Sequence, residues 1–136
     1  MRIVFDLDQT LVGYARNGHL MLNRKLLGVA EKFRADGHTI ILWTFGNRAW
    51  WRHVARRFPA LRAVFHEVYS RDELEGHETR APMEFGGRRF TVPQRVKDIR
   101  VIGGDVLIDN DEGHHEWARR HGLASQYIRV PAFGGA

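Results

Sequence analysis

The chain contains no cysteine among its 136 residues. This absence excludes disulfide bridges, a thiolate zinc site and a thiol nucleophile. Hydrophobic residues make up 43% of the chain, which suffices for one core, but no apolar run approaches the roughly 20 residues that span a bilayer. A strand signal begins at once, leaving no room for a signal peptide, and no linker or repeat interrupts the sequence. We therefore expect one domain over residues 1–136, soluble and cytoplasmic, with no membrane partner.

Lysine is also scarce, because only Lys25, Lys32 and Lys97 among the 21 basic residues are lysine. The formal net charge is +5, which favours a polyanionic partner such as nucleic acid or a phosphorylated chain. However, the arginines are dispersed along the sequence, as GC-rich coding alone would produce. Composition leaves both explanations open.

The order of the predicted elements is that of an α/β protein. Strand signals at 2–5 and 39–43 flank a helical pattern at 23–36 that ends before Gly37, and this unit predicts two parallel strands with a right-handed crossover. The later elements are a helix over 47–58, a strand over 63–69, a strand over 105–109, a helix over 112–121 and a strand over 127–130. We predict a three-layer, Rossmann-like parallel sheet.

Two short insertions interrupt this order. Residues 12–22 contain Asn17-Gly18, a hairpin turn signal, and predict a small β-hairpin flap over the end of the first strand. Residues 70–95 contain Gly86-Gly87 between alternating arms and predict a short insert with a second hairpin. Neither segment is long enough for a large cap, so we expect an open site that admits macromolecular substrates.

Polar residues follow the predicted strands at the edge where parallel sheets bind ligands. Asp6 and Asp8 follow the first strand, Thr44 follows the second, Asp109 and Asn110 follow a later one, and Lys97 precedes that later strand by a turn or two of helix. Each signal is weak alone: a threonine after a strand is often a helix cap, and an isolated lysine usually lies at the surface. Together and in this order they predict a phosphate site.

These residues resemble the motifs of a known superfamily. The segment Asp6-Leu7-Asp8-Gln9-Thr10 is similar to the first motif of the haloacid dehalogenase (HAD) superfamily of aspartate-nucleophile phosphatases. More narrowly, the chain resembles the small RNA polymerase II C-terminal-domain phosphatases and the NLI-interacting-factor-like proteins. The segments that carry this narrower resemblance are Leu42-Trp43-Thr44, Val96-Lys97-Asp98-Ile99 and Val106-Leu107-Ile108-Asp109-Asn110. It implies a capless domain with Asp109 and Asn110 at a metal site.

The chemistry of phosphate esters explains these residue types. Asp6 as nucleophile would form an aspartyl-phosphate, and Asp8 would protonate the leaving oxygen and then activate water. Thr44 and the N–H groups of the following helix would bind phosphate, while Lys97 would neutralise charge. Mg²⁺ suits oxygen ligands, which Asp6, the main-chain carbonyl of Asp8, and Asp109 or Asn110 would supply.

Some alternatives stay open. Asp111-Glu112 replace the serine that usually follows Asp-Asn in this type of phosphatase, and Gly104-Asp105 also fits another form of the fourth motif, although we prefer Asp109 at the strand end. The main hypothesis is a Mg²⁺-dependent phosphatase acting on phosphoproteins or other macromolecular phosphate esters. The alternatives are a nucleotide or nucleic-acid-end phosphatase and a non-catalytic domain that binds phosphorylated ligands. A monomer is compatible with the sequence.

Overall fold

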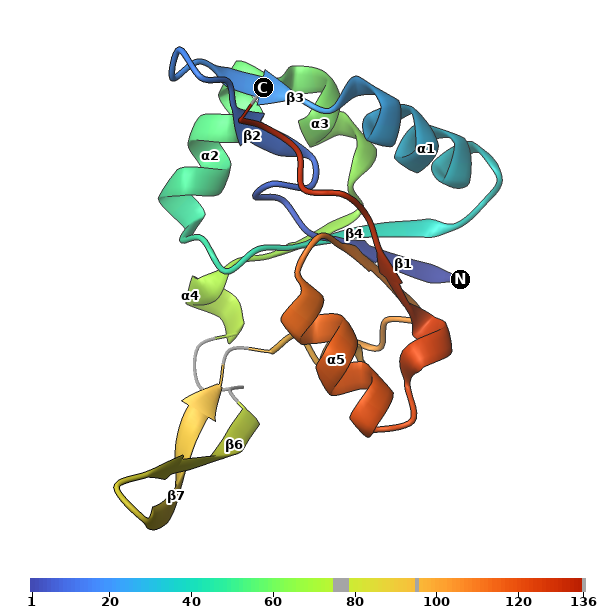
Figure 1. Ribbon diagram of the computed structural model, residues 1–136. Coiled ribbons are helices and arrows are strands. Elements are labelled where there is room, and N and C mark those ends of the chain that lie inside the picture. The colour runs from blue at the N-terminus through green and yellow to red at the C-terminus, as the bar shows by residue number, and fades with distance from the viewer. Residues whose placement is uncertain (75–78, 95, 136) are drawn as a thin grey trace.

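The computed structural model describes residues 1–74, 79–94 and 96–135 (Figure 1). Its centre is a five-stranded sheet made of β1 (Arg2–Phe5), β4 (Thr39–Trp43), β5 (Glu67–Tyr69), β8 (Val106–Asp109) and β9 (Tyr127–Arg129). The strand order is β5-β4-β1-β8-β9, and every pairing is parallel. The predicted α/β, Rossmann-like architecture is therefore confirmed.

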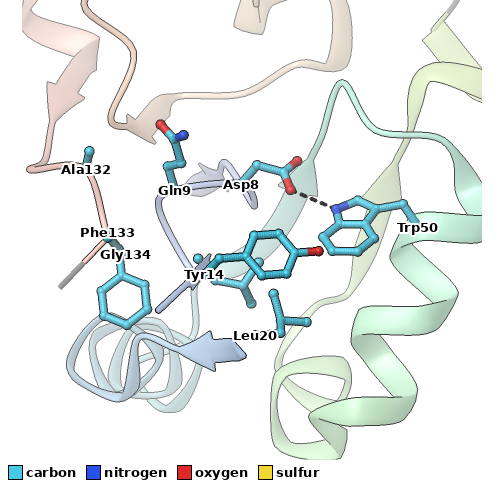
Figure 2. Close-up of a pocket in the computed structure, with 11 residues that line it drawn as sticks. Asp8, Gln9, Tyr14, Leu20, Trp50, Ala132, Phe133 and Gly134 are labelled. Atoms are coloured by element: carbon cyan, nitrogen blue, oxygen red, sulfur yellow. Dashed lines mark hydrogen bonds between the residues drawn. The ribbon is translucent and has the colours of Figure 1, made fainter. Parts of the chain in front are cut away.

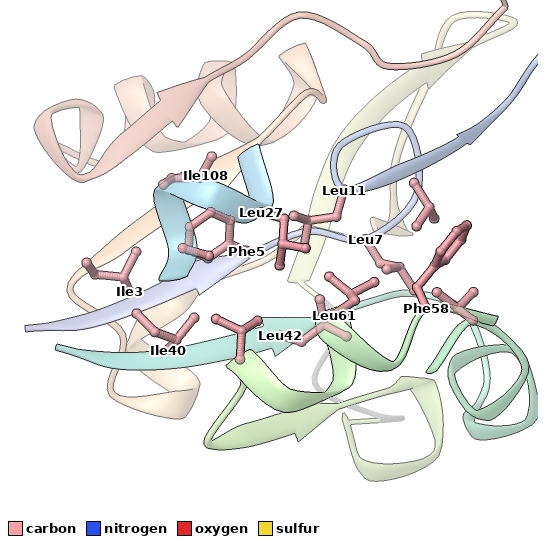
Figure 3. Packing of buried hydrophobic residues seen from close by; sticks show 14 residues of the cluster. Ile3, Phe5, Leu7, Leu11, Leu27, Ile40, Leu42, Phe58, Leu61 and Ile108 are labelled. Atoms are coloured by element: carbon pink, nitrogen blue, oxygen red, sulfur yellow. The ribbon is translucent and has the colours of Figure 1, made fainter. Parts of the chain in front are cut away.

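Helices cover both faces of this sheet. On one face lie α1 (Arg24–Ala35), α2 (Arg48–Arg57) and α3 (Pro59–Val64); on the other lie α5 (Glu112–Arg120) and the 3-10 helix η1 (Ile99–Ile102). Side chains alternate along β1, so that Ile3 and Phe5 enter the first core, shown in Figure 3, while Val4 enters the second. Because both faces are covered, the three central strands β4, β1 and β8 are mostly apolar.

Local sequence signals set where the helices begin. The Asn23 side chain caps α1 by accepting the Leu26 N–H, and the Asn47 side chain caps α2 by accepting the Trp50 N–H. Gly37 lies beyond the end of α1 with φ +93°, a conformation that favours glycine. These caps place the start of α2 directly after the carboxyl end of β4.

The prediction of one strand over residues 63–69 is wrong in its first part. The chain there forms α3, with Pro59 in its first turn, and the strand is confined to β5. Leu61 and Val64 lie three residues apart and both enter the first core, a helical spacing rather than an alternation. The apolar residues before β5 therefore serve α3.

The two predicted hairpins are present. In the flap, β2 (Val12–Tyr14) pairs with β3 (Leu20–Leu22); in the later insert, β6 (Thr79–Phe85) pairs with β7 (Arg88–Gln94). Positive φ at both Gly86 and Gly87 gives the turn that suits a two-residue hairpin. The insert also contains the short helix α4 (Arg71–Leu74), and its hairpin projects away from the sheet (Figure 1). Residues 75–78 and 95 of the predicted insert lie outside the described residues.

The remaining short element is η2 (Ala124–Gln126), which leads into β9. Within the described ranges, every helix is too short or too polar to cross a lipid bilayer.

Candidate active site

The carboxyl ends of β1, β4 and β8 bring the predicted site residues together. A pocket of about 190 Å³ at this edge is lined by Asp6, Asp8, Gln9, Phe45, Lys97, Asp109, Asn110, Asp111 and His114. Thr44 adjoins it through a hydrogen bond to Asp8. The six residues singled out from the sequence therefore converge on one place, although they are spread over about 100 positions of the chain.

A buried ion cluster forms the floor of this pocket. The Lys97 Nζ lies 2.5 Å from Asp6 Oδ1 and 3.0 Å from Asp109 Oδ2, and all three side chains are at most 10% exposed. Burial alone would lower the pKa of Lys97, but the two carboxylates outweigh it and raise that pKa. Burial raises the pKa of Asp6, against the opposing effect of Lys97 and with a further contribution from Asp109. One cation thus balances two carboxylates.

Two aromatic residues hold Lys97 in this position. The Tyr127 hydroxyl donates to the Lys97 carbonyl at 2.5 Å and accepts the Ile99 N–H at 3.1 Å, and burial raises the pKa of Tyr127 to about 12. The His114 Nδ1 accepts the Lys97 N–H at 3.4 Å. Burial, assisted by the positive Lys97, lowers the pKa of His114 to about 4, so this imidazole is neutral at pH 7.

Asp8 has the opposite environment from Asp6. Its side chain is exposed, yet both carboxylate oxygens accept hydrogen bonds: Oδ2 from the Thr44 hydroxyl at 3.1 Å and Oδ1 from the Trp50 indole N–H at 2.7 Å (Figure 2). The Thr44 hydroxyl also accepts the Gly46 N–H at 3.0 Å. Asp8 is therefore oriented by side chains from the end of β4 and from α2 while it remains open to solvent.

A group of oxygen atoms lies beside the buried cluster. The Asn110 Oδ1 is 3.1 Å from Asp6 Oδ2 and 3.2 Å from the Asp8 main-chain oxygen. The Thr10 hydroxyl lies 2.9 Å from both Asp6 Oδ2 and Asn110 Oδ1. The Asn110 oxygen thus lies from each of the other two, on Asp6 and Asp8, at the spacing of adjacent ligands of an octahedral Mg²⁺, which are about 3 Å apart when the metal–oxygen distance is about 2.1 Å.

The same geometry also fits an arrangement without metal. If the Asn110 side-chain amide is flipped, its nitrogen takes the place of Oδ1 and donates hydrogen bonds to Asp6, Asp8 and Thr10. Asp109, in contrast, directs Oδ2 to Lys97 and accepts the Asp111 N–H on Oδ1 at 2.9 Å. Within the described residues, no group of three or more acidic or histidine side chains is arranged to bind a metal. A cation here would therefore use a carboxylate, a carbonyl and an amide oxygen.

The loop after β1 has the shape that this arrangement requires. Gln9 adopts φ +59°, which is uncommon for a residue other than glycine. The next three N–H groups, from residues 10, 11 and 12, all donate to the Leu7 carbonyl at 2.9–3.2 Å. This tight turn directs the Asp8 carbonyl toward Asp6 and Asn110, and strained conformations of this kind concentrate at functional sites.

Comparison with known proteins gives structural similarity only. No protein-family model and no curated sequence matches the chain. A solved structure of the fission yeast RNA polymerase II CTD phosphatase Fcp1, a point variant bound to beryllium fluoride, superposes with a TM-score of 0.62 at 15% identity over 98% of this chain. The Pnkp1/Rnl/Hen1 RNA repair complex contains a chain with a TM-score of 0.57 at 20% identity over 96% of this chain.

The chain therefore shares the fold of these solved structures, a HAD-like α/β fold. The chain covers 42% of each of those two solved chains, so it spans less than half of their length. Within this fold, Asp6, Thr44 and Asp109 lie at or next to the carboxyl ends of β1, β4 and β8, whereas Lys97 reaches the same place from the segment before η1. The rejected alternative, Asp105, lies at the opposite edge of the sheet, where it accepts the Arg2 N–H at 2.7 Å.

The structure adds residues that the sequence reasoning did not single out. Thr10 lies inside the recognised motif, which was the available sequence signal, and the structure places its hydroxyl 2.9 Å from Asp6. Trp50 and Tyr127 carried no such signal, because their partners are about 30 or 40 positions away. Of the adjacent residues His114 and His115, only His114 lines the pocket. Arg48, at the start of α2, forms an ion pair with Glu73 at 2.7 Å and does not reach the pocket.

Proposed function

We propose that this protein is a Mg²⁺-dependent phosphomonoesterase that works through an aspartyl-phosphate on Asp6. The observation that supports this most is the contrast between the two carboxylates of the first motif. Asp6 is buried against Lys97 and suits a nucleophile whose charge must be balanced, whereas Asp8 is solvent-exposed and oriented for proton transfer. A protein that only binds phosphorylated ligands has no use for Asp8 in that position.

In the first step, an Asp6 carboxylate oxygen attacks phosphorus and the bond from phosphorus to the ester oxygen breaks. Asp8 donates its proton to that oxygen, and the alcohol leaves. In the second step, Asp8 removes a proton from water, the water oxygen attacks phosphorus, and inorganic phosphate leaves with Asp6 regenerated. Lys97 balances the charge of Asp6 in both steps. Thr44 would bind a phosphoryl oxygen only after its hydroxyl exchanges Asp8 for that oxygen.

The residues present fit a magnesium ion. Asp6 Oδ2, the Asp8 carbonyl and Asn110 Oδ1 would hold it, and the Thr10 hydroxyl would orient two of these ligands. Asp109 adjoins the ion site and holds Lys97 beside it. Bound Mg²⁺ would supply positive charge to the phosphoryl oxygens.

The open pocket suits a phosphorylated macromolecule. The similar solved structures are a CTD phosphatase and part of an RNA repair complex, which supports a phosphorylated protein or RNA as the substrate class. The flap and the segment 132–135 line a cavity beside Asp8 and can contact such a substrate beyond its phosphate.

The test is hydrolysis of p-nitrophenyl phosphate by the purified protein, with Mg²⁺, after chelation, and after Mg²⁺ is restored. We expect metal-dependent turnover that Asp6→Asn abolishes while circular dichroism shows an intact fold. Asp105→Asn is a matched control, because it alters a carboxylate at the opposite edge of the sheet. Turnover that persists in Asp6→Asn, or that ignores chelation, contradicts the proposal.

A further inference from the structure

A second, larger cavity adjoins the catalytic pocket. It has a volume of about 480 Å³ and shares Asp8 and Gln9 with the pocket that contains Asp6 and Lys97. Its other walls come from the flap, from Trp50 on α2 and from the segment 132–135 (Figure 2). Asp8 thus stands at the border between the phosphate pocket and this cavity. Because Asp8 protonates the leaving oxygen in the proposed reaction, the leaving group must extend toward the cavity.

The far wall of the cavity is fixed by backbone contacts. The Phe133 N–H donates to the Gln9 carbonyl and the Gly135 N–H donates to the Tyr14 carbonyl, each at 2.7 Å. Gly13 permits this approach, since a Cβ atom there would lie 2.1 Å from the Phe133 carbonyl oxygen. The segment 132–135 therefore lies along β2 as a built part of the cavity.

Two aromatic rings of the cavity lining, those of Tyr14 and Trp50, lie beside each other. Tyr14 is 54% exposed, and its ring centroid lies 6.3 Å from that of Trp50 at an interplanar angle of 31°. Trp50 is held by its hydrogen bond to Asp8 and is stacked on His53 at 5.7 Å. Asp8 is the one charged side chain among the residues that line the cavity. Such a surface suits a planar, uncharged ring better than a charged or highly polar group.

We infer that this cavity binds the leaving group of the substrate and that the leaving group is a nucleoside. The inference rests on the proposed phosphatase function. In a nucleotide the sugar separates the base from the ester oxygen, so a phosphate at Asp6 places the base beyond Asp8, where Tyr14 and the flap lie. Stacking on exposed aromatic side chains is a common way of binding bases, and the net charge of +5 favours a polyanionic nucleic acid.

The test compares adenosine 5′-monophosphate with ribose 5-phosphate, which have the same scissile bond and the same type of leaving alcohol. They differ in the base, so the ratio of their kcat/KM values measures base binding in the transition state. We expect a ratio of about 5 to 150, the range that one stacked base provides. A 5′-phosphorylated oligonucleotide then distinguishes a nucleic-acid end from a free nucleotide by its own kcat/KM.

Two variants distinguish the contribution of the Tyr14 ring to base binding from that of the rest of the flap. Tyr14→Leu removes the aromatic ring but keeps an apolar side chain. We expect this variant to lower the kcat/KM for adenosine 5′-monophosphate until it is close to the kcat/KM for ribose 5-phosphate. Met21→Leu is the matched control, because Met21 lies on the paired flap strand, is 44% exposed and does not line the cavity. We expect that control to leave the ratio unchanged. Equal losses in the two variants overturn the inference.

Failure of this inference is distinguishable from failure of the phosphatase proposal. A ratio near one together with Mg²⁺-dependent hydrolysis of a phosphoserine or phosphotyrosine peptide overturns the nucleoside site and leaves the phosphatase standing. If no ester is hydrolysed, the phosphatase proposal fails. In that case, tighter binding of adenosine 5′-monophosphate than of ribose 5-phosphate to the wild-type protein still supports the inference that the cavity binds a nucleoside. Equal binding overturns that inference.

Discussion

Replacing Lys97 by methionine removes the positive charge that two buried carboxylates share. The Lys97 side chain is 1% exposed, and its Nζ contacts Asp6 Oδ1 at 2.5 Å and Asp109 Oδ2 at 3.0 Å. Removing one partner of a buried ion pair costs about 3–5 kcal/mol, because the remaining charge loses its compensation. Here one substitution leaves two carboxylates uncompensated, so we expect a loss in the upper part of that range.

Protonation limits the size of this loss. A carboxylate that is too costly to keep charged takes up a proton instead. From an ordinary pKa of 3.8, protonation at pH 7 costs about 4 kcal/mol per group. In the variant the pKa of Asp6 would rise further, so the folded state would bind protons more tightly than the unfolded state. The stability of Lys97→Met should therefore increase as the pH falls from 7 toward 4, and the difference from wild type should shrink.

The assay is urea unfolding followed by circular dichroism, at pH 7 and pH 5, with a chelator present. Lys25→Met makes the same chemical change at an exposed position in the first turn of α1, and we expect it to alter the free energy of unfolding by less than about 0.5 kcal/mol. Combining Lys97→Met with Asp6→Asn should cost less than the sum of the single changes. A loss at pH 7 no greater than that of Lys25→Met would refute the reasoning.

Three further predictions concern the surroundings of this cluster. His114 has a pKa lowered to about 4 by burial and by Lys97, so this residue should cost nothing above pH 6.5 and should by itself lower the stability by about 3 kcal/mol as the pH drops toward 4. In His114→Gln, urea midpoints should therefore depend less on pH over that window. Thr10→Val removes the hydroxyl between Asp6 and Asn110 and should weaken Mg²⁺ about 10- to 100-fold in a metal titration of activity, whereas Thr10→Ser should not. Gly13→Ala places a Cβ against the Phe133 carbonyl and should displace the segment 132–135 from β2. Hydrogen exchange should then show the Phe133 and Gly135 amides losing protection, and unchanged protection would contradict the contact.

Much of the site could be predicted because its residues sit at the ends of strands with strong signals of their own. β1 and β8 are short apolar runs, and Asp6 and Asp109 lie at or next to their ends. In a parallel sheet these ends meet at one edge, so the two carboxylates were expected to approach each other without knowledge of side-chain positions. The same argument placed Thr44 at the end of β4.

The parts that could not be predicted depend on contacts between distant segments. The pairing of Trp50 with Asp8 requires α2 to start directly after β4 and to turn its first residues toward the β1 loop. The contact between the segment 132–135 and β2 joins the flap to a glycine-rich stretch that has no periodic pattern of its own. The strand expected from residue 63 failed for another reason, since an apolar run as short as residues 63–65 fits the end of a helix as well as a strand.

The contacts around Asp8 show that the second motif extends beyond Thr44. A Cβ atom on Gly46 would lie 2.7 Å from the Trp50 ring and 3.2 Å from the Thr44 hydroxyl, so a glycine is needed for both groups to reach Asp8 together. The Asn47 cap then fixes the first turn of α2, and with it the direction of the Trp50 indole. Thr44, Gly46, Asn47 and Trp50 therefore form one group of residues that orients the Asp8 carboxylate from two sides. Because Trp50 also lines the larger cavity, a leaving group bound there would contact the same side chain that holds the Asp8 carboxylate in place.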